Sequence, residues 1–288
     1  MSLSTFSISA LDQNTGDFGV AVQSKFLAVG AIVPWARAGI GAIATQAHAN
    51  VSFGPVGLDL LEQDVGAIDT LEQLLDKDEG RQLRQVGLVD ADGTAAAFTG
   101  EACMEWAGHI TGAGYTVQGN ILAGVSVLEA MATTFEIMEE EDLPERLLAG
   151  LEAGQEAGGD KRGQQSAALL VVRENGGYGS TSDRMVDLRV DDHSFPIEEL
   201  QRLYRLHQLY FGVTDPARLL KIQGDLATEI QRILYSLDYY NGPITGLHDD
   251  ATRHALEQWH NTENFEERLW QDAFIDPEVL AYMREKAG

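Results

Sequence analysis

Apolar and polar positions alternate with a period of two almost from the start of the chain. Phe6 and Ile8 fall on one face of the predicted strand Thr5–Ala10, and the hydroxyl residues between them fall on the other. The same alternation returns in Gly19–Ser24 after an Asn- and Gly-rich segment that is typical of a turn. The pattern therefore predicts an N-terminal β-hairpin with one apolar face and one polar face.

Blocks of strands and blocks of helices follow this hairpin. Further strands are predicted at Ala28–Pro34, Gly39–Gln46, Gln85–Val89, Ala95–Thr99, Ser166–Arg173 and Met185–Val190. Helices are predicted from Gly54-Pro55 onward and at Ile68–Asp76, Ser126–Glu139 and Pro144–Ala153. The polar, Gly-rich segment 112–120 is expected to lead into the third of these helices. Because strands and helices do not alternate strictly, the order favours an α+β fold of antiparallel sheets sandwiched between helical layers.

The chain changes character after Phe195-Pro196, where the pattern becomes helical to the end. Helices are expected at Ile197–Tyr210, Asp225–Leu237, Asp249–His260 and Pro277–Lys286. We therefore expect three parts: a layered domain over 1–195, a connecting helix over 196–222 and a small all-helical domain over 223–288.

Composition and net charge limit the classes of partner that the protein can bind. The net charge is −25 and only five of the basic residues are lysine, so the acidic surface disfavours nucleic acid and anionic membranes. Met1–Ser4 lack a basic, apolar signal region, and no apolar run approaches ~18 residues, so we expect a cytoplasmic protein. Cys103 stands alone and is expected to be a small buried hydrophobe. No metal and no cofactor is expected, and we expect a homo-oligomer.

Thr5 is the strongest candidate for a catalytic residue. A threonine that begins a buried strand can act as a nucleophile if its own α-amine is free to accept the hydroxyl proton. An α-amine titrates near ~8, so a large part of it is neutral at physiological pH. The alternative is that Thr5 is simply a good strand former, which threonine favours.

Other polar residues stand near the ends of the predicted strands. Lys25 could lower the pKa of the amine, or it could be a solvated lysine at a strand end. Thr45 and Gln46 could bind an oxyanion, or they could cap the strand. Asp160 could hold Lys25 in place, or it could belong to a solvated loop. Five further residues could contact substrate or could make structural hydrogen bonds only. They are His48, Asn50, Gln118, Asn120 and Ser166, the last of which begins the predicted strand Ser166–Arg173.

The first part of the chain resembles the DUF1028 family. The motifs that carry the resemblance are Thr5-Phe6-Ser7-Ile8, Gly19-Val20-Ala21-Val22, Ser24-Lys25-Phe26-Leu27-Ala28-Val29-Gly30, Val33-Pro34-Trp35-Ala36, Ala44-Thr45-Gln46-Ala47, Gln118-Gly119-Asn120 and Ser182-Asp183-Arg184. That family is grouped with the N-terminal nucleophile (Ntn) hydrolases, so the resemblance implies a four-layer αββα sandwich. It also implies a site around Thr5 formed by Ser24-Lys25, Thr45-Gln46, Asn120 and Asp160. Read from the residues alone, Gln118-Gly119-Asn120 places two amide side chains around a glycine before a helix, which suits either substrate recognition or a tight turn with Asn120 as the helix N-cap.

The C-terminal part is similar to peptidoglycan-binding domains. The similar runs are Gln231-Arg232-Ile233-Leu234, Leu237-Asp238-Tyr239-Tyr240-Asn241-Gly242, Gly246 and Ala251-Thr252-Arg253-His254-Ala255-Leu256. This resemblance implies a glycan or protein partner for the module.

Two hypotheses about function follow. In the first, the protein is an amidohydrolase of the Ntn type that acts on a small amide or peptide-like substrate. In the second, it is a non-catalytic scaffold of the same fold that binds a small ligand or a partner. The first requires the removal of Met1–Ser4, because they precede Thr5 and loss of Met1 alone would expose Ser2.

Overall fold

A computed structural model describes residues 5–270 and 272–288. The chain forms two compact units, of which the first ends at Tyr204 and the second comprises Arg205–Gly288. The division falls inside α5 (Pro196–Phe211), within the stretch expected to be a connecting helix. The predicted fold class is confirmed: an αββα sandwich is followed by a small, mainly helical unit.

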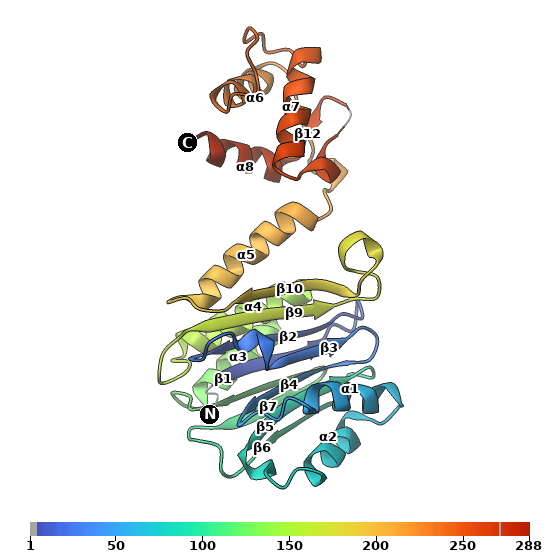
Figure 1. Ribbon diagram of the computed structural model, residues 1–288, viewed down its shortest axis with the longest axis vertical. Helices are drawn as coiled ribbons and strands as arrows, with labels where there is room; N and C mark the ends of the chain where they lie inside the picture. Colours follow the sequence, from blue (N-terminus) through green and yellow to red (C-terminus); the bar gives the residue numbers. More distant parts are fainter. Residues whose placement is uncertain (1–4, 271) are drawn as a thin grey trace. The chain divides into compact units, whose positions relative to one another are not determined.

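Two antiparallel sheets lie face to face in the N-terminal unit (Figure 1). The larger sheet has the order β10-β9-β2-β1-β8-β7, and the smaller has the order β3-β4-β5-β6. The strands of the larger sheet are β1 (Thr5–Leu11), β2 (Phe18–Ser24), β7 (Gly108–Gly112), β8 (Tyr115–Asn120), β9 (Ser166–Val172) and β10 (Arg184–Val190). Those of the smaller sheet are β3 (Pro34–Arg37), β4 (Gly41–Ala47), β5 (Arg84–Asp90) and β6 (Ala95–Thr99). The N-terminal strand β1 is thus central, between β2 and β8.

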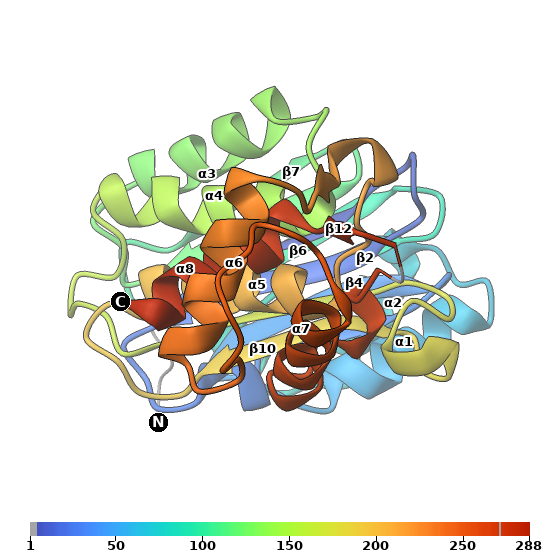
Figure 2. The same ribbon diagram turned by 90° about the horizontal axis from the view of Figure 1, so that it is seen from above.

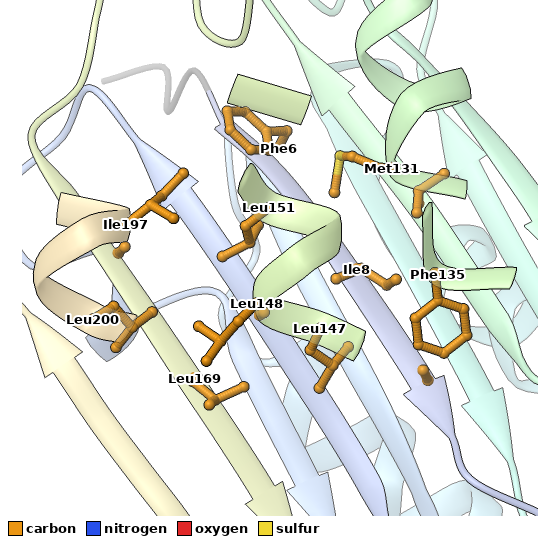
Figure 3. Close-up of a cluster of buried hydrophobic side chains, with 14 of the residues drawn as sticks. Phe6, Ile8, Met131, Phe135, Leu147, Leu148, Leu151, Leu169, Ile197 and Leu200 are labelled. Carbon is orange, nitrogen blue, oxygen red and sulfur yellow. The ribbon is translucent and has the colours of Figure 1, made fainter. Parts of the chain in front are cut away.

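Two helices cover the outer face of each sheet. α1 (Phe53–Glu62) and α2 (Ala67–Asp76) cover the smaller sheet. α3 (Ser126–Ile137) and α4 (Leu143–Glu156) run side by side over the larger one (Figures 1 and 2). The apolar face of β1 explains this layer, because Phe6 and Ile8 point into the cluster formed by α3, α4, β9 and the start of α5 (Figure 3). Each such side chain contributes about 1.5–3 kcal/mol by burial.

The space between the two sheets is apolar on one side and polar on the other. The apolar part is formed by Leu11, Phe18, Val20, Val22, Val29, Val33, Ala42, Ala44, Val89, Ala168, Leu170 and Val172. The polar part lies toward the beginning of β1, where Thr5, Ser7 and Ser9 face the smaller sheet and are fully buried. The polar face that alternation predicts for β1 is therefore an interior face, not a solvent face.

The C-terminal unit packs three helices around its own core. They are α6 (Asp225–Ser236), α7 (Asp250–Thr262) and α8 (Pro277–Ala287), and a two-residue strand pair accompanies them, β11 (Leu220–Lys221) with β12 (Phe274–Ile275). Trp259 and Phe265 are at the centre of its apolar cluster. A buried ion pair adds to it, since Arg268 Nη2 lies 2.6 Å from Asp276 Oδ2. Asp276 also accepts a hydrogen bond from the backbone N–H of Glu278 and so caps α8.

One predicted strand is absent, and the strand β8 was not predicted. Ala28–Pro34 is not a strand but contains a short 3-10 turn at Val29–Ala31, and the strand begins only at Pro34. Ala28 there has a positive φ of 53°, which a strand does not allow. Conversely, the Gly-rich segment 112–120 contains the whole of β8, which is buried and pairs with β1 and β7.

None of the helices in the described residues is both long and apolar enough to cross a membrane.

Candidate active site

Thr5 lies at the beginning of β1 with a neighbour on either side. It pairs in register with Ser24 at the end of β2 and with Asn120 at the end of β8. Its side chain is fully buried, and Oγ1 donates a hydrogen bond to Ser24 Oγ at 3.2 Å. The structure therefore brings together three of the candidates, Thr5, Ser24 and Asn120, at one end of the larger sheet.

A layer of buried polar side chains extends from Thr5 between the two sheets, and we call it the polar layer. It consists of Thr5, Ser7, Ser9, Gln46, Gln85, Thr116, Gln118 and Asn120. Its members come from β1 and β8 of one sheet and from β4 and β5 of the other. Buried polar groups are costly unless they are hydrogen-bonded, so their partners decide what the layer can do.

Gln46 uses its amide to join the sheets. Its Oε1 accepts a hydrogen bond from Ser7 Oγ at 2.7 Å. Its Nε2 lies 2.9 Å from Gln85 Oε1, 3.2 Å from the carbonyl oxygen of Gln118 and 3.4 Å from that of Thr5. An amide nitrogen has only two hydrogens, and acceptors within the protein take both. In this arrangement Gln46 has no hydrogen left for an oxyanion, so it supports the strand that carries Thr5.

Gln85 is the centre of the layer, and the sequence did not single it out. Its Oε1 accepts hydrogen bonds from Gln46 Nε2 and from Asn120 Nδ2, both at 2.9 Å. Its Nε2 donates to the carbonyl oxygens of Gly108 and Gly119 at 3.0 Å and 2.8 Å. Gln85 thus fixes the orientation of Asn120 beside Thr5. The available signal was its place at the start of a strand, facing inward with Gln46 opposite it.

Gln118 is also engaged within the protein. Its Nε2 donates to Ser7 Oγ at 2.7 Å, and its Oε1 packs against Gly87 of β5. A Cβ at Gly87 would lie 2.0 Å from that oxygen and 2.4 Å from Thr116 Oγ1. Gly87 is therefore the residue that leaves room for the polar layer. Gly119 contributes its carbonyl oxygen to Gln85 and no side chain to the site.

Three candidates lie on the far side of β4 or beyond its end. Thr45 faces away from Gln46, and its Oγ1 donates to the carbonyl oxygen of Asn50 at 3.2 Å. Asn50 donates from Nδ2 to Asp78 Oδ2 at 2.9 Å, and the carbonyl oxygen of His48 accepts from Arg84 Nη1 at 2.7 Å. These contacts fasten the loop between β4 and α1 and do not bring the three side chains to Thr5.

Asp78 anchors that loop, and its charge gives a pH-dependent prediction. Hydrogen bonds from Arg84 lower the pKa of Asp78 from 3.8 to about 2. Because the folded pKa is below the ordinary value, the carboxylate stabilises the fold above pH 3.8 and loses this effect as the pH falls toward 2. We expect Asp78→Asn to lower the free energy of unfolding at pH 7 by about 2 kcal/mol. Urea unfolding from pH 7 to pH 3 should show the difference shrinking below about pH 4.

The matched control is Asp76→Asn. Asp76 also faces an arginine, but its carboxylate is 79% exposed and lies 3.4 Å from Arg81. Exposed pairs of this kind contribute less than about 1 kcal/mol, so this variant should unfold almost as the parent does at every pH. Equal effects of the two substitutions would contradict the assignment to Asp78.

Lys25, Asp160 and Ser166 shape the loops at the end of β2. Asp160 Oδ2 accepts from the backbone N–H of Lys25 at 3.0 Å, and its Oδ1 accepts from that of Arg162 at 2.9 Å. The ammonium of Lys25 donates to the carbonyl oxygen of Gln164 at 3.1 Å. Ser166 Oγ accepts from the backbone N–H of Val29 at 3.1 Å. Asp160 thus holds the backbone of Lys25, and the ammonium points along the neighbouring loop.

Neither metal-binding side chains nor Cys103 form a second candidate site in the part of the chain that the structure describes. No cluster of three or more His, Cys, Asp or Glu side chains that could hold a metal ion occurs in residues 5–270 and 272–288. Cys103 is buried, and burial raises the pKa of its thiol, which keeps it protonated and unreactive.

Comparison with known proteins gives a family match for each unit. The family model for the family of unknown function DUF1028 matches residues 5–200, and the model described as "Putative peptidoglycan binding domain" matches residues 210–283. A crystal structure of a DUF1028 protein from Silicibacter pomeroyi is 33% identical, with a TM-score of 0.65 over 78% of this chain and 92% of that chain. Anbu (ancestral beta-subunit) from Yersinia bercovieri is 10% identical, with a TM-score of 0.32 over 72% and 95% of the two chains. A search of curated proteins gave no match. The chain belongs to the DUF1028 family.

Proposed function

We propose that the N-terminal unit is an amidohydrolase of the Ntn type, with Thr5 as its nucleophile. The observation that carries the proposal is the position of Thr5 at the beginning of the central strand of an αββα sandwich, with its hydroxyl 3.2 Å from Ser24 Oγ. A β-strand at the centre of a sheet holds its first residue rigidly, which nucleophilic attack requires. Ser24 orients the hydroxyl, and Asn120, itself oriented by Gln85, lies on the opposite side of Thr5.

The reaction is a two-step acyl transfer. The α-amine of Thr5 accepts the hydroxyl proton while Oγ1 forms a bond to the amide carbon. The C–N bond then breaks, and the same proton passes to the leaving amine. Water next attacks the resulting ester with the α-amine again as base, so that a carboxylic acid leaves and the hydroxyl is restored.

In this proposal the other candidates have supporting roles. Gln46 and Gln118 hold β1 against the smaller sheet through Ser7. Asp160 fixes the backbone where β2 ends at Lys25. Thr45, His48 and Asn50 fasten the loop after β4, one layer away from the nucleophile.

The test is the N-terminal residue of the mature protein together with hydrolysis of a panel of small amides. Residues 1–4 lie outside the described part of the chain, and the proposal requires that they be removed to free the amine of Thr5. Intact-mass measurement after expression should show a chain that begins at Thr5, and this chain should hydrolyse at least one amide. A protein that retains residues 1–4 and is equally active would overturn the mechanism.

A non-catalytic scaffold is the second candidate, and one observation favours it. The amides of Gln46 and Gln118 are engaged within the protein, and the side chain of Thr5 is fully buried, so the polar layer serves packing as it stands. Under this alternative the purified protein keeps residues 1–4, hydrolyses none of the panel and is stabilised in a thermal-shift screen by a ligand it does not alter.

For the C-terminal unit we propose glycan binding, with peptidoglycan as the ligand. The family match over residues 210–283 supports it. The full chain should sediment with insoluble peptidoglycan and not with cellulose, and equal recovery with both would contradict it. A cytoplasmic location and a homo-oligomeric state stay predictions from the sequence.

A further inference from the structure

A small pocket opens at the edge of the larger sheet where β2 ends and β9 begins. It has a volume of about 350 Å³ and is lined by Lys25, Gln164, Gln165, Asp192, His193 and Ser194. Ser24, the residue before Lys25, is the register partner of both Thr5 and Ser166. Neighbouring strands are about 4.8 Å apart, so the pocket begins within one or two strand spacings of the candidate nucleophile.

The walls of the pocket are held in place by hydrogen bonds between its loops. The backbone N–H of Gln165 donates to the carbonyl oxygen of Ser24 at 3.1 Å, and that of His193 donates to the carbonyl oxygen of Gln165 at 2.7 Å. The side chain of Gln165 donates from Nε2 to Asp192 Oδ1 at 3.0 Å. The loops before β9 and after β10 are thus joined to the end of β2, and the pocket exists before any ligand arrives.

Two polar groups of the lining, the ammonium of Lys25 and Oε1 of Gln164, have incomplete interactions among the described residues. The ammonium of Lys25 donates to a neutral carbonyl oxygen, that of Gln164, and no carboxylate of the described residues lies within ion-pair distance of it. Gln164 Oε1 is buried and has no hydrogen-bond partner among the described residues. An ammonium favours an anionic acceptor, and a buried amide oxygen favours an N–H donor.

We propose that this pocket binds the carboxylate and the adjacent amide N–H of an N-acyl amino acid. Lys25 takes the carboxylate, and the side chain of Gln164 turns into the pocket so that its Oε1, which is buried in the structure, accepts the N–H. A single lysine matches one negative charge, whereas the carboxylate of Asp192 in the same lining opposes a doubly charged phosphate. This inference rests on the proposed function, because it places the acyl carbonyl of the ligand toward Thr5. Hydrolysis then releases a carboxylic acid and the free amino acid.

Binding of a probe that cannot be hydrolysed tests the pocket separately from catalysis. N-(methylsulfonyl)glycine carries the carboxylate and the N–H, and its primary amide lacks only the charge. Titration of the protein followed by two-dimensional ¹H–¹⁵N NMR should shift the backbone signals of Gln164, Gln165 and His193. The acid should bind at least about tenfold more tightly than the amide, as expected of one charge-assisted contact.

Lys25→Met should remove this tenfold preference, and Lys77→Met should keep it. The first variant is expected to fold, because Asp160 binds the backbone of residue 25 and the side chain makes one neutral contact. Lys77 is an exposed lysine at the end of α2 in the same unit. Equal binding of the two probes, or a preference that survives Lys25→Met, overturns the assignment.

The two proposals fail in different ways. If the acid probe binds as expected but no amide is hydrolysed, the proposed function falls and the pocket assignment stands. If amides are hydrolysed with equal kcat/KM whether or not they carry the carboxylate, the pocket assignment falls and the amidohydrolase stands.

Discussion

Thr5→Val should abolish amide hydrolysis, with kcat/KM falling by at least about 10⁴-fold for any amide that the parent protein hydrolyses. Valine keeps the β-branched shape that suits the start of β1 and removes only the hydroxyl. The fold should therefore persist, with loss of the single hydrogen bond from Thr5 Oγ1 to Ser24 Oγ. Steady-state kinetics on the amide panel, with far-UV circular dichroism as a check on folding, measure the effect.

The same variant reports on how the N-terminus is processed. If Thr5 Oγ1 attacks the preceding peptide carbonyl, the valine variant retains residues 1–4 and its intact mass shows them. If a separate peptidase removes them, the valine variant loses them as the parent does, and self-cleavage is contradicted while the nucleophile assignment stands.

Thr5→Ser is the control for the nucleophile. Serine keeps the hydroxyl and its hydrogen bond, so it should restore both processing and measurable hydrolysis. A serine variant as inactive as the valine variant, or a valine variant as active as the parent, would remove Thr5 from the mechanism.

Gln85→Met should lower the free energy of unfolding by about 3 kcal/mol or more. Methionine has the length of glutamine and fills the same space, but it has neither the donor nor the acceptor. Asn120 Nδ2 and the carbonyl oxygens of Gly108 and Gly119 then lose the hydrogen bonds that they make to Gln85. Each buried polar group left unpaired costs about 1–3 kcal/mol. Urea unfolding at pH 7, followed by circular dichroism, measures the change.

Gln82→Met is the matched control for this effect. Gln82 is exposed three residues before Gln85, and its side chain accepts one hydrogen bond, from the backbone N–H of Glu101. Exposed substitutions usually change stability by less than about 0.5 kcal/mol. If Gln85→Met differs from Gln82→Met by less than about 1 kcal/mol, the polar layer does not stabilise the contact between the sheets.

The sequence predicted β1, β5 and β6, but it did not predict β8. Thr5–Ala10 and Ala95–Thr99 were placed within a residue of β1 and β6. β8 was taken for a polar approach to a helix, because Thr116, Gln118 and Asn120 look solvated when read alone. They are buried because β8 faces the smaller sheet, where Gln85 accepts a hydrogen bond from Asn120, and because Gln118 donates to Ser7 of the neighbouring strand. Single-strand periodicity does not reveal such partners.

The residues of the candidate site, too, were only partly predictable from the pattern of single strands. Alternation placed Thr5 on the polar face of its strand, and the structure puts Ser24 and Asn120 on either side of it. Thr45 and Gln46 are neighbours in sequence and were expected to act together, but adjacent residues in a strand face opposite sides of the sheet. Only Gln46 therefore reaches the layer that contains Thr5, and Gln85 enters it from a strand whose partner was not predictable.

The pairing of β1 has a consequence for the order of events during protein synthesis. Thr5 lies beside Ser24, which is made shortly after it, but also beside Asn120, and Ser24 in turn pairs with Ser166. A nascent chain on the ribosome thus lacks the Asn120 neighbour of Thr5 until β8 has emerged, and it lacks the outer neighbour of Ser24 until β9 has emerged. If the chain frees its own nucleophile, it does so only after most of the first unit has been translated and has collapsed. Under that condition, unfinished chains would not be cleaved.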